Sequence, residues 1–210
     1  MARVICDMSI SLDGYVTGPN DSREHPFGDG AERLHDWIFD AATDDDRAVL
    51  QDMLDGVGAI VMGRKSFDKN EGDGGWGDSG PVCDTPCFVV THRKPTRLHP
   101  AIYTFVRDGV VSAIEQAKHA AGDRVVGLHG ATVMQQALPL GLVDDIRVHM
   151  IPVLLGGGTR PCSRPWTQRS ASSAPRRWRP LPRRTLDSVS CGRRCARRPV
   201  SRPRRSSPAQ

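Results

Sequence analysis

Two kinds of hydrophobic pattern alternate along the first 160 residues of the chain. Apolar runs of strand length predict strands, and they occupy residues 3–12, 57–62, 87–90, 124–128 and 145–152. Apolar residues spaced three and four apart predict helices at 31–39, 43–54, 110–121 and 131–138. At the start of the second helix, Thr43 is a candidate N-cap, and the three acids that follow it favour the positive end of the helix dipole.

This alternation predicts an α/β fold with a central, mostly parallel sheet that helices cover on both faces. The run at 57–62 contains no polar side chain, which is typical of a strand buried on both faces. Ligands of such sheets bind at the carboxyl ends of the strands. We therefore expect the functional residues directly after the predicted strands.

Charge divides the chain into two unlike parts at about residue 160. The 210 residues carry 29 basic and 24 acidic side chains, a formal net charge of +5. Residues 1–160 hold 15 of the basic and 23 of the acidic side chains, a net charge of −8, whereas residues 161–210 hold 14 Arg and one acid, a net charge of +13. The sequence thus predicts a domain over 1–160 and an appended tail over 161–210.

Several classes of protein are excluded by this pattern. No apolar run approaches the length of a membrane-spanning helix, and Asp7 interrupts the start of the chain too early for the apolar region of a signal peptide. A cytoplasmic protein without a membrane partner is the expectation. Cysteines 83 and 87, and likewise 191 and 195, stand four apart, which does not match the common zinc motifs, so no metal site is predicted.

Three segments directly after predicted strands carry cations or glycines. Residues 63–66 combine a glycine with two cations at a helix start, which suits a phosphate, but an ordinary strand-to-helix turn has the same pattern. Residues 91–93 on their own fit a solvated loop. Residues 127–132 open a helix whose N–H groups suit a pyrophosphate, although they are not the full dinucleotide fingerprint.

The same segments resemble a known family. The opening 8–20 (MSISLDGYVTGPN), the turn 62–67 (MGRKSF) and the later segments 141–145 (GLVDD) and 152–158 (PVLLGGG) are similar, in this order, to the dihydrofolate-reductase-like proteins. Within them, they resemble the branch that contains the reductase domain of riboflavin biosynthesis. The resemblance covers about residues 3–160 and implies a three-layer fold, an NADPH-dependent reductase and, since relatives often form dimers, a homodimer.

This resemblance also implies where the cofactor NADPH binds. The residues implied are Gly63, Arg64, Lys65 and Ser66 for the adenosine phosphates, Thr91 and Arg93 for the adenine side, and Gly130, Ala131 and Thr132 for the pyrophosphate. Many relatives carry adjacent glycines in the last motif, whereas here His129 precedes Gly130. A side chain at position 129 can crowd the cofactor.

Asp13 is the candidate catalytic residue, because it is the only acid in the matched opening before residue 20 and it ends a predicted strand. Together with Gly14 it would face the substrate, where it orients the substrate or assists protonation; a simple Asp-Gly turn is the alternative. Trp76 belongs to the glycine-rich loop 73–78, which is either a lid whose Trp stacks on a flat heterocycle or a solvent loop anchored by one Trp. The expected reaction is hydride transfer from NADPH to a C=N or C=O bond of a small pterin- or pyrimidine-like substrate.

The tail has the composition of a disordered segment, with 14 Arg, 9 Ser and 8 Pro among its 50 residues. An Arg-rich tail neutralises nucleic-acid phosphates without specificity, so a nucleic-acid-associated protein with the body as scaffold is the alternative function. The composition of the tail is also typical of GC-rich DNA that is translated out of frame. Restoring one cytosine after codon 160 can turn the sequence RPCSR into RPLFE, and relatives commonly carry LFE at this place. A folded tail and an inactive remnant remain further alternatives.

Restoring this cytosine is expected to raise the melting temperature. A frameshift removes the strand that closes the sheet and leaves the strand at 145–152 as an edge with exposed apolar side chains. A strand that buries three or four aliphatic side chains contributes on the order of 5–10 kcal/mol. Thermal melts of the present chain, a chain ending at Arg160 and the frame-restored chain test this. Truncation is expected to change the melting temperature little and restoration to raise it greatly, whereas equal melts of the present and restored chains would show that the tail is native.

Overall fold

A computed structural model describes residues 2–39, 43–71, 75–95 and 98–162 of the chain. The tail predicted at 161–210 lies outside the described residues from residue 163 onward, as do residues 73 and 74 of the predicted lid loop. The disorder, frameshift and nucleic-acid hypotheses for the tail therefore stay predictions. No helix in the described part of the chain has the length and apolar character needed to cross a membrane.

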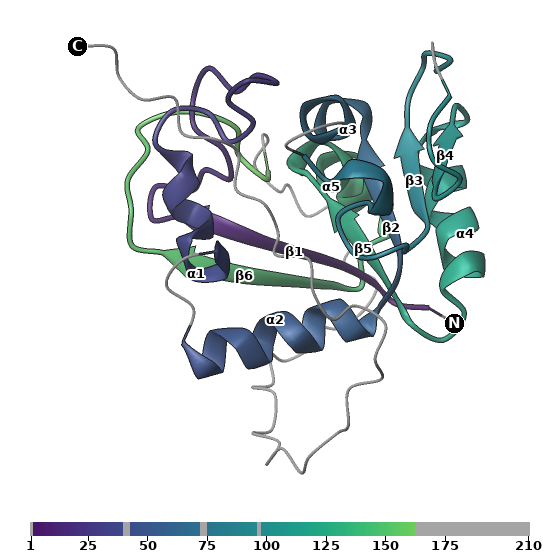
Figure 1. The fold of residues 1–210 in the computed structure, drawn as a ribbon, viewed down its shortest axis with the longest axis horizontal. Coiled ribbons are helices and arrows are strands. Elements are labelled where there is room, and N and C mark those ends of the chain that lie inside the picture. The colour runs from purple at the N-terminus through teal and green to yellow at the C-terminus, as the bar shows by residue number, and fades with distance from the viewer. Residues whose placement is uncertain (1, 40–42, 72–74, 96–97, 163–210) are drawn as a thin grey trace. The chain divides into compact units, whose positions relative to one another are not determined.

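Six parallel strands form the centre of the domain (Figure 1). In sheet order they are β4 (Tyr103–Val106), β3 (Cys87–Val90), β2 (Val57–Gly63), β5 (Val125–His129), β1 (Val4–Ser11) and β6 (Asp145–Ile151). The five predicted strands and the α/β class are confirmed. β4 was not predicted, because Thr104 interrupts its four residues, whereas the four residues of β3 form a continuous apolar run.

Helices cover both faces of this sheet. On one side, called here the α4 face, α4 (Gly109–Ala121) and α5 (Ala131–Ala137) pack on alternate residues of the strands; η3 (Leu138–Leu140) follows α5. On the other side, the α2 face, lie η1 (Ala31–His35), α1 (Asp36–Phe39), α2 (Asp44–Gly56) and α3 (Arg64–Asn70); η2 (Gly77–Ser79) follows α3 in the chain. The three-layer arrangement agrees with the prediction.

Two buried clusters fill the space between sheet and helices. On the α4 face, Val4, Val61 and Leu128 pack against Ile114 of α4, and Cys6 is fully buried among them, which raises the pKa of its thiol to about 12. On the α2 face, Phe67 of α3 packs against alternate residues of β2 and β3. Residues 57–62 of β2 are all buried, as their continuous apolar run predicts.

The helix α2 begins as its sequence predicts but packs loosely. Thr43 is its N-cap: the Thr43 hydroxyl accepts the Asp46 N–H at 3.2 Å, and the Asp46 carboxylate accepts the Thr43 N–H at 2.9 Å. No residue of α2 is fully buried. Figure 1 shows this helix running alongside β1 and β6, and a cavity of 220 Å³ separates it from the sheet.

β6 is the outermost strand on one side of the sheet in the described residues. Its alternate residues Ile146, Val148 and Met150 pair in register with Cys6, Met8 and Ile10 of β1, so they point to the α4 face. They are 45%, 48% and 65% exposed. The described helices thus leave an apolar stripe uncovered on this edge strand, which is an aggregation hazard.

Met150→Lys is expected to leave the free energy of unfolding within about 0.5 kcal/mol of the parent value, since the side chain is mostly exposed. It should also reduce aggregation, because a charge on an edge strand opposes pairing with a second chain. Urea unfolding and light scattering measure the two effects. Val126→Lys, at a fully buried position of β5, is the matched control and should prevent cooperative folding. A large loss of stability in Met150→Lys would contradict the exposure of this stripe.

Candidate functional site

The three strand ends singled out in the sequence lie side by side. β2 pairs with β3 so that Gly63 is opposite Val90, and it pairs with β5 so that Met62 is opposite His129. The segment after β2 is therefore flanked by the segment after β3 on one side and by the segment after β5 on the other. The structure brings all the predicted cofactor-binding residues to one edge of the sheet, as the parallel order requires.

The closest approach at this edge is between the segments after β2 and β5. Gly130 has a φ of +93°, a backbone conformation that strains any other residue, and a Cβ built on it would lie 2.7 Å from the Ser66 hydroxyl. Thr132 and Gly63 are also neighbours, with 3.9 Å between a Cβ built on the glycine and the threonine Cβ. Ala131, in the first turn of α5, is buried. The segments after β2 and β5 thus form a cradle in which the Gly130 backbone lies close to the Ser66 side chain.

Arg64 lies at the start of α3, and only some of the N–H groups of its guanidinium have hydrogen-bond partners. Its Nε donates to the Asp68 carboxylate at 2.6 Å, and the guanidinium carbon is 5.7 Å from the ring centroid of Phe67 and 5.6 Å from that of Phe105. One terminal nitrogen, NH1, is buried and has no hydrogen-bond partner among the described residues. A buried charged donor without a partner is costly, so Arg64 has the chemistry to take a phosphate oxygen.

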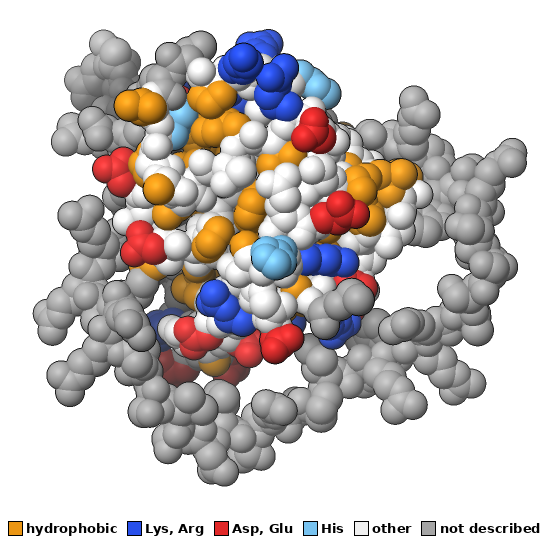
Figure 2. All heavy atoms as spheres, turned by 90° about the vertical axis from the view of Figure 1, so that its right-hand side faces the viewer, with side chains coloured by type: hydrophobic (Ala, Val, Ile, Leu, Met, Phe, Trp, Pro, Cys, Tyr) orange, Lys and Arg blue, Asp and Glu red, His pale blue; other side chains and the backbone are white. Residues whose placement is uncertain are grey.

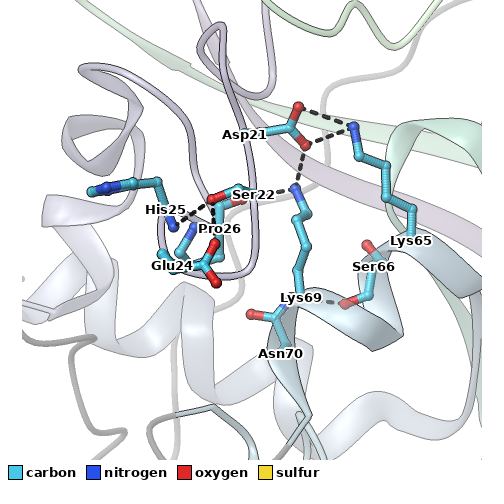
Figure 3. A network of polar contacts seen from close by, with 9 residues as sticks. All are labelled: Asp21, Ser22, Glu24, His25, Pro26, Lys65, Ser66, Lys69 and Asn70. Atoms are coloured by element: carbon cyan, nitrogen blue, oxygen red, sulfur yellow. Dashed lines mark hydrogen bonds and ion pairs between the residues drawn. The ribbon is translucent and has the colours of Figure 1, made fainter.

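Lys65 is turned toward the loop that follows β1 (Figure 3). Its Nζ lies 3.0 Å from one carboxylate oxygen of Asp21, and the Nζ of Lys69 lies 2.6 Å from the other oxygen and 2.8 Å from the Pro26 carbonyl. Although burial raises the pKa of Asp21, the two lysines lower it to a net value below its usual range. The sequence analysis missed Asp21 and Lys69; the spacing of two lysines four apart on α3 was the available signal.

Thr91 and Arg93 form a tight turn after β3. The Thr91 hydroxyl accepts the Arg93 N–H at 3.1 Å, and Thr91 is buried whereas Arg93 is exposed. A shallow hollow of 670 Å³ borders this turn, lined by His92, Phe105, Val106, Arg107, Asp108 and Gln116. Figure 2 shows basic side chains gathered at the top of the face on this side of the molecule. The turn fits a solvated loop and also offers room for the adenine side of a dinucleotide.

Asp13 holds two loops together at the end of β1. Its carboxylate accepts the Ser11 hydroxyl at 2.6 Å and the backbone N–H groups of Leu155 at 3.1 Å and Gly156 at 2.7 Å. The Ser11 hydrogen bond is the main cause that lowers the pKa of Asp13 to about 2; desolvation opposes this, and the two backbone groups add to it. Asp13 is thus ionised near neutral pH. Its contacts fit the turn alternative, in which Gly14 follows with a φ of +86°, and they leave it no proton to donate.

Trp76 contacts His129 rather than standing free. The two rings meet edge-on with their centroids 4.9 Å apart, and the imidazole Nδ1 is buried without a hydrogen-bond partner in the described residues. Burial lowers the pKa of His129 to about 4, helped by the charge of Lys69, so the ring is neutral near pH 7. His129, whose side chain was expected to crowd the cofactor, thus lies beside Trp76, the residue expected to stack on a flat heterocycle.

A second polar cluster, which was not predicted from the sequence, lies on the α2 face of β1 and β6. Asp7 and Ser9 of β1 face this side together with Arg147 and His149 of β6. Each residue stands alone between apolar neighbours in the sequence, so only the pairing of two distant strands reveals the cluster. Among the residues described, no group of His, Cys, Asp and Glu has the arrangement of a metal site.

Asp13→Asn is expected to lower the melting temperature near neutral pH, since the amide accepts the N–H groups of the 155–156 segment less strongly than a carboxylate. The pKa of Asp13 falls from an ordinary value of 3.8 to about 2 on folding. Its contribution is therefore present above about pH 4 and lost as the pH falls toward 2. Melts of both chains across this range should converge at low pH. Asp123→Asn, at an exposed turn, is the control, and a difference that persists at pH 2 would contradict the assignment.

Comparison with known proteins supports this fold. The chain is 26% identical over 168 residues to the uncharacterized protein YyaP of Bacillus subtilis (strain 168), covering 74% of this chain and 78% of that protein. A crystal structure from Shewanella sp. PV-4, named as a riboflavin biosynthesis protein, has a TM-score of 0.54 at 23% identity, covering 78% of this chain and 84% of that one. This likeness confirms the fold.

A weaker likeness joins the chain to dihydrofolate reductase from Enterococcus faecalis, complexed with NADP(H) and RAB-propyl, with a TM-score of 0.46 at 14% identity over 78% of this chain and 79% of that one. The family model described as the RibD C-terminal domain matches residues 2–186. This match spans most of the chain and agrees with the motifs at 8–20 and 62–67. The chain therefore belongs to the RibD C-terminal domain family.

Proposed function

We propose that this chain is an NADPH-dependent reductase that transfers a hydride to a C=N or C=O bond of a small heterocyclic substrate. The RibD C-terminal domain family supports a reductase-type function. The proposal adds to this the cofactor, the residues that hold it and the class of substrate. The residues that would hold the cofactor lie at the edge where β3, β2 and β5 end.

The buried, unpaired NH1 of Arg64 is the observation that carries the choice of cofactor. NADPH differs from NADH by one phosphate, and a charge-assisted hydrogen bond from a guanidinium is well suited to a phosphate oxygen. Arg64 is held in place by Asp68 and by the rings of Phe67 and Phe105. A pre-oriented donor loses little side-chain entropy when the phosphate binds.

The neighbouring residues suit the rest of a dinucleotide. The narrow contact of Gly130 with Ser66 lets backbone N–H groups approach a pyrophosphate, as a Cβ at position 130 would not. Lys65 is 64% exposed and can leave Asp21 for a phosphate, because Lys69 keeps its own 2.6 Å contact with that carboxylate. NADPH, when bound, supplies the hydride. Trp76 and His129 stand beside this cradle as a wall for a flat ring.

Arg64→Ala is expected to weaken NADPH binding by about 10- to 100-fold, since one charge-assisted hydrogen bond contributes roughly 1.5–3 kcal/mol. NADH binding should barely change. Titration calorimetry with both cofactors measures this, and Arg3→Ala, which loses an ion pair with Asp145 at the opposite ends of the strands, is the control. Equal losses for NADPH and NADH would exclude a phosphate contact for Arg64, and absence of binding by the parent chain would exclude the proposed function.

A further inference from the structure

The edge strand β6 carries a row of exposed apolar side chains on the α4 face. The helices of that face, α4 and α5, pack on β2, β3 and β5, and in Figure 1 β1 and β6 extend away from α4. The exposed side chains are those of Ile146, Val148 and Met150, called here the β6 row. A row of this kind on a sheet edge marks a place where a second chain can pair.

The main chain of β6 is open at the same residues. Odd-numbered residues of β1 point their N–H and C=O groups at β5, since the Arg3 carbonyl accepts the Val126 N–H, and even-numbered residues point theirs at β6. Cys6 of β1 is opposite Ile146, so it bonds the neighbours of Ile146 rather than Ile146 itself. The main-chain groups of the β6 row therefore point outward, and no backbone group among the described residues pairs with them.

The rest of the chain contains no sequence that matches the β6 row. A strand paired with this row needs apolar side chains at alternate positions, where they meet those of the row. Residues 163–210 hold 14 Arg and only four large aliphatic side chains, no two of which are two positions apart. β6 itself has three apolar side chains at alternate positions. The best match for the outer edge of β6 is therefore β6 of a second copy of this chain.

The sequence of β6 selects one register for antiparallel pairing with a second β6. With Val148 opposite the partner's Val148, Ile146 lies opposite the partner's Met150, so the whole β6 row forms apolar pairs and its outward main-chain groups meet. Moving the axis one residue toward the N-terminus places Met150 opposite the partner's Asp144. Moving it the other way places Ile146 opposite the partner's Pro152, which has no N–H to donate.

The charges on the α2 face are complementary in this register. Arg147 lies opposite the partner's His149, whose imidazole contacts the partner's Asp7 at 2.6 Å. On its own chain, the Arg147 NH1 is 4.0 Å from Asp7, which is longer than a hydrogen bond, and the side chain is 40% exposed. Pairing thus brings an incompletely bonded guanidinium toward a carboxylate of the second copy.

We propose that this chain forms a twofold dimer in which β6 pairs antiparallel with β6 of a second copy, with the axis at Val148. The two sheets then continue into one, and neither copy keeps β6 as an open edge. A contact between two strands of seven residues is smaller than a standard interface of about 1,600 Å², so the dimer dissociates at about micromolar concentrations. β1 and β5 separate β6 from β2 in the sheet, so the proposal is independent of the proposed cofactor site.

Sedimentation velocity of the full chain between about 1 and about 300 µM should show a reversible equilibrium of monomer and dimer. Val148→Lys places two like charges opposite each other at the axis and should raise the dissociation constant about tenfold or more. Val111→Lys, at a similarly exposed valine of α4, is the matched control and should dimerise as the parent does. An equimolar mixture of Val148→Lys and Val148→Glu should recover a dimer, because opposite charges then meet, and this recovery also shows that both variants fold.

Cross-linking tests the register. With glutathione disulfide as the oxidant, Val148→Cys should form a disulfide with the same position of the partner, because residues directly opposite each other lie within the Cα distance that a disulfide spans. Ile146→Cys, in the same row, should form no such link, since four residues, or about 14 Å, separate the two copies of this position along the strands. Mass spectrometry of the linked peptides identifies each bond.

A chain that stays monomeric at every concentration would overturn the inference. So would a mixture of the Lys and Glu variants that recovers no dimer, or self-linking at position 146 as strong as at position 148. A disulfide from position 148 to Cys191 or Cys195 within one chain would overturn it as well and would assign the β6 row to the tail.

Discussion

Parallel pairing of β2 with both β3 and β5 is the constraint on which the rest of this site depends. Because all three strands run in the same direction, the segments that follow them emerge at one edge. Residues 63–66, 91–93 and 130–132 are distant in sequence, but the register places them next to each other. The glycine at position 130 then decides how closely two of these segments approach. A side chain there would be strained by the positive φ and would force the Ser66 hydroxyl to move.

Asp13 and Asp21, which follow β1, each connect their loop to a distant segment of the chain, and their sequence neighbours do not predict these contacts. Asp13 binds the loop 12–30 to the segment that follows β6, and Asp21 binds the same loop to α3 through Lys65 and Lys69. The loop is therefore tied to the segment after β6 at one point and to α3, at the proposed cofactor site, at the other. Since both carboxylates have pKa values below their usual ranges, they act near neutral pH as fixed negative charges.

The α2 face of the sheet differs in character from the α4 face. The α4 face is closed by apolar side chains that exclude solvent near β2 and β5. On the α2 face, β1 and β6 present Asp7, Ser9, Arg147 and His149, and the covering helix α2 buries none of its residues fully. Polar groups on a covered sheet face carry a desolvation cost, and on this face hydrogen bonds of Ser9 with Trp37 and of Asp7 with His149 offset part of it.

The order of helices and strands was readable from the sequence because it depends on local periodicity and capping. The buried run at 57–62, the Thr43 cap and the parallel α/β architecture all follow from residues that are close together in the chain. β4 was not predicted, because its four residues include the exposed Thr104 and lack the continuous apolar run that identifies β3.

The sequence by itself determined which strand ends carry cations and glycines. The motifs, which occur in the same order as in the family, assigned these strand ends to a cofactor site. Only the tertiary structure decided that Asp13 is saturated by Ser11, Leu155 and Gly156, that Lys65 faces Asp21, and that Asp7 of β1 meets His149 of β6 across 142 residues of chain. These contacts depend on the relative positions of distant elements, and the distance between two side chains of different strands is set by the register of the sheet rather than by any local pattern.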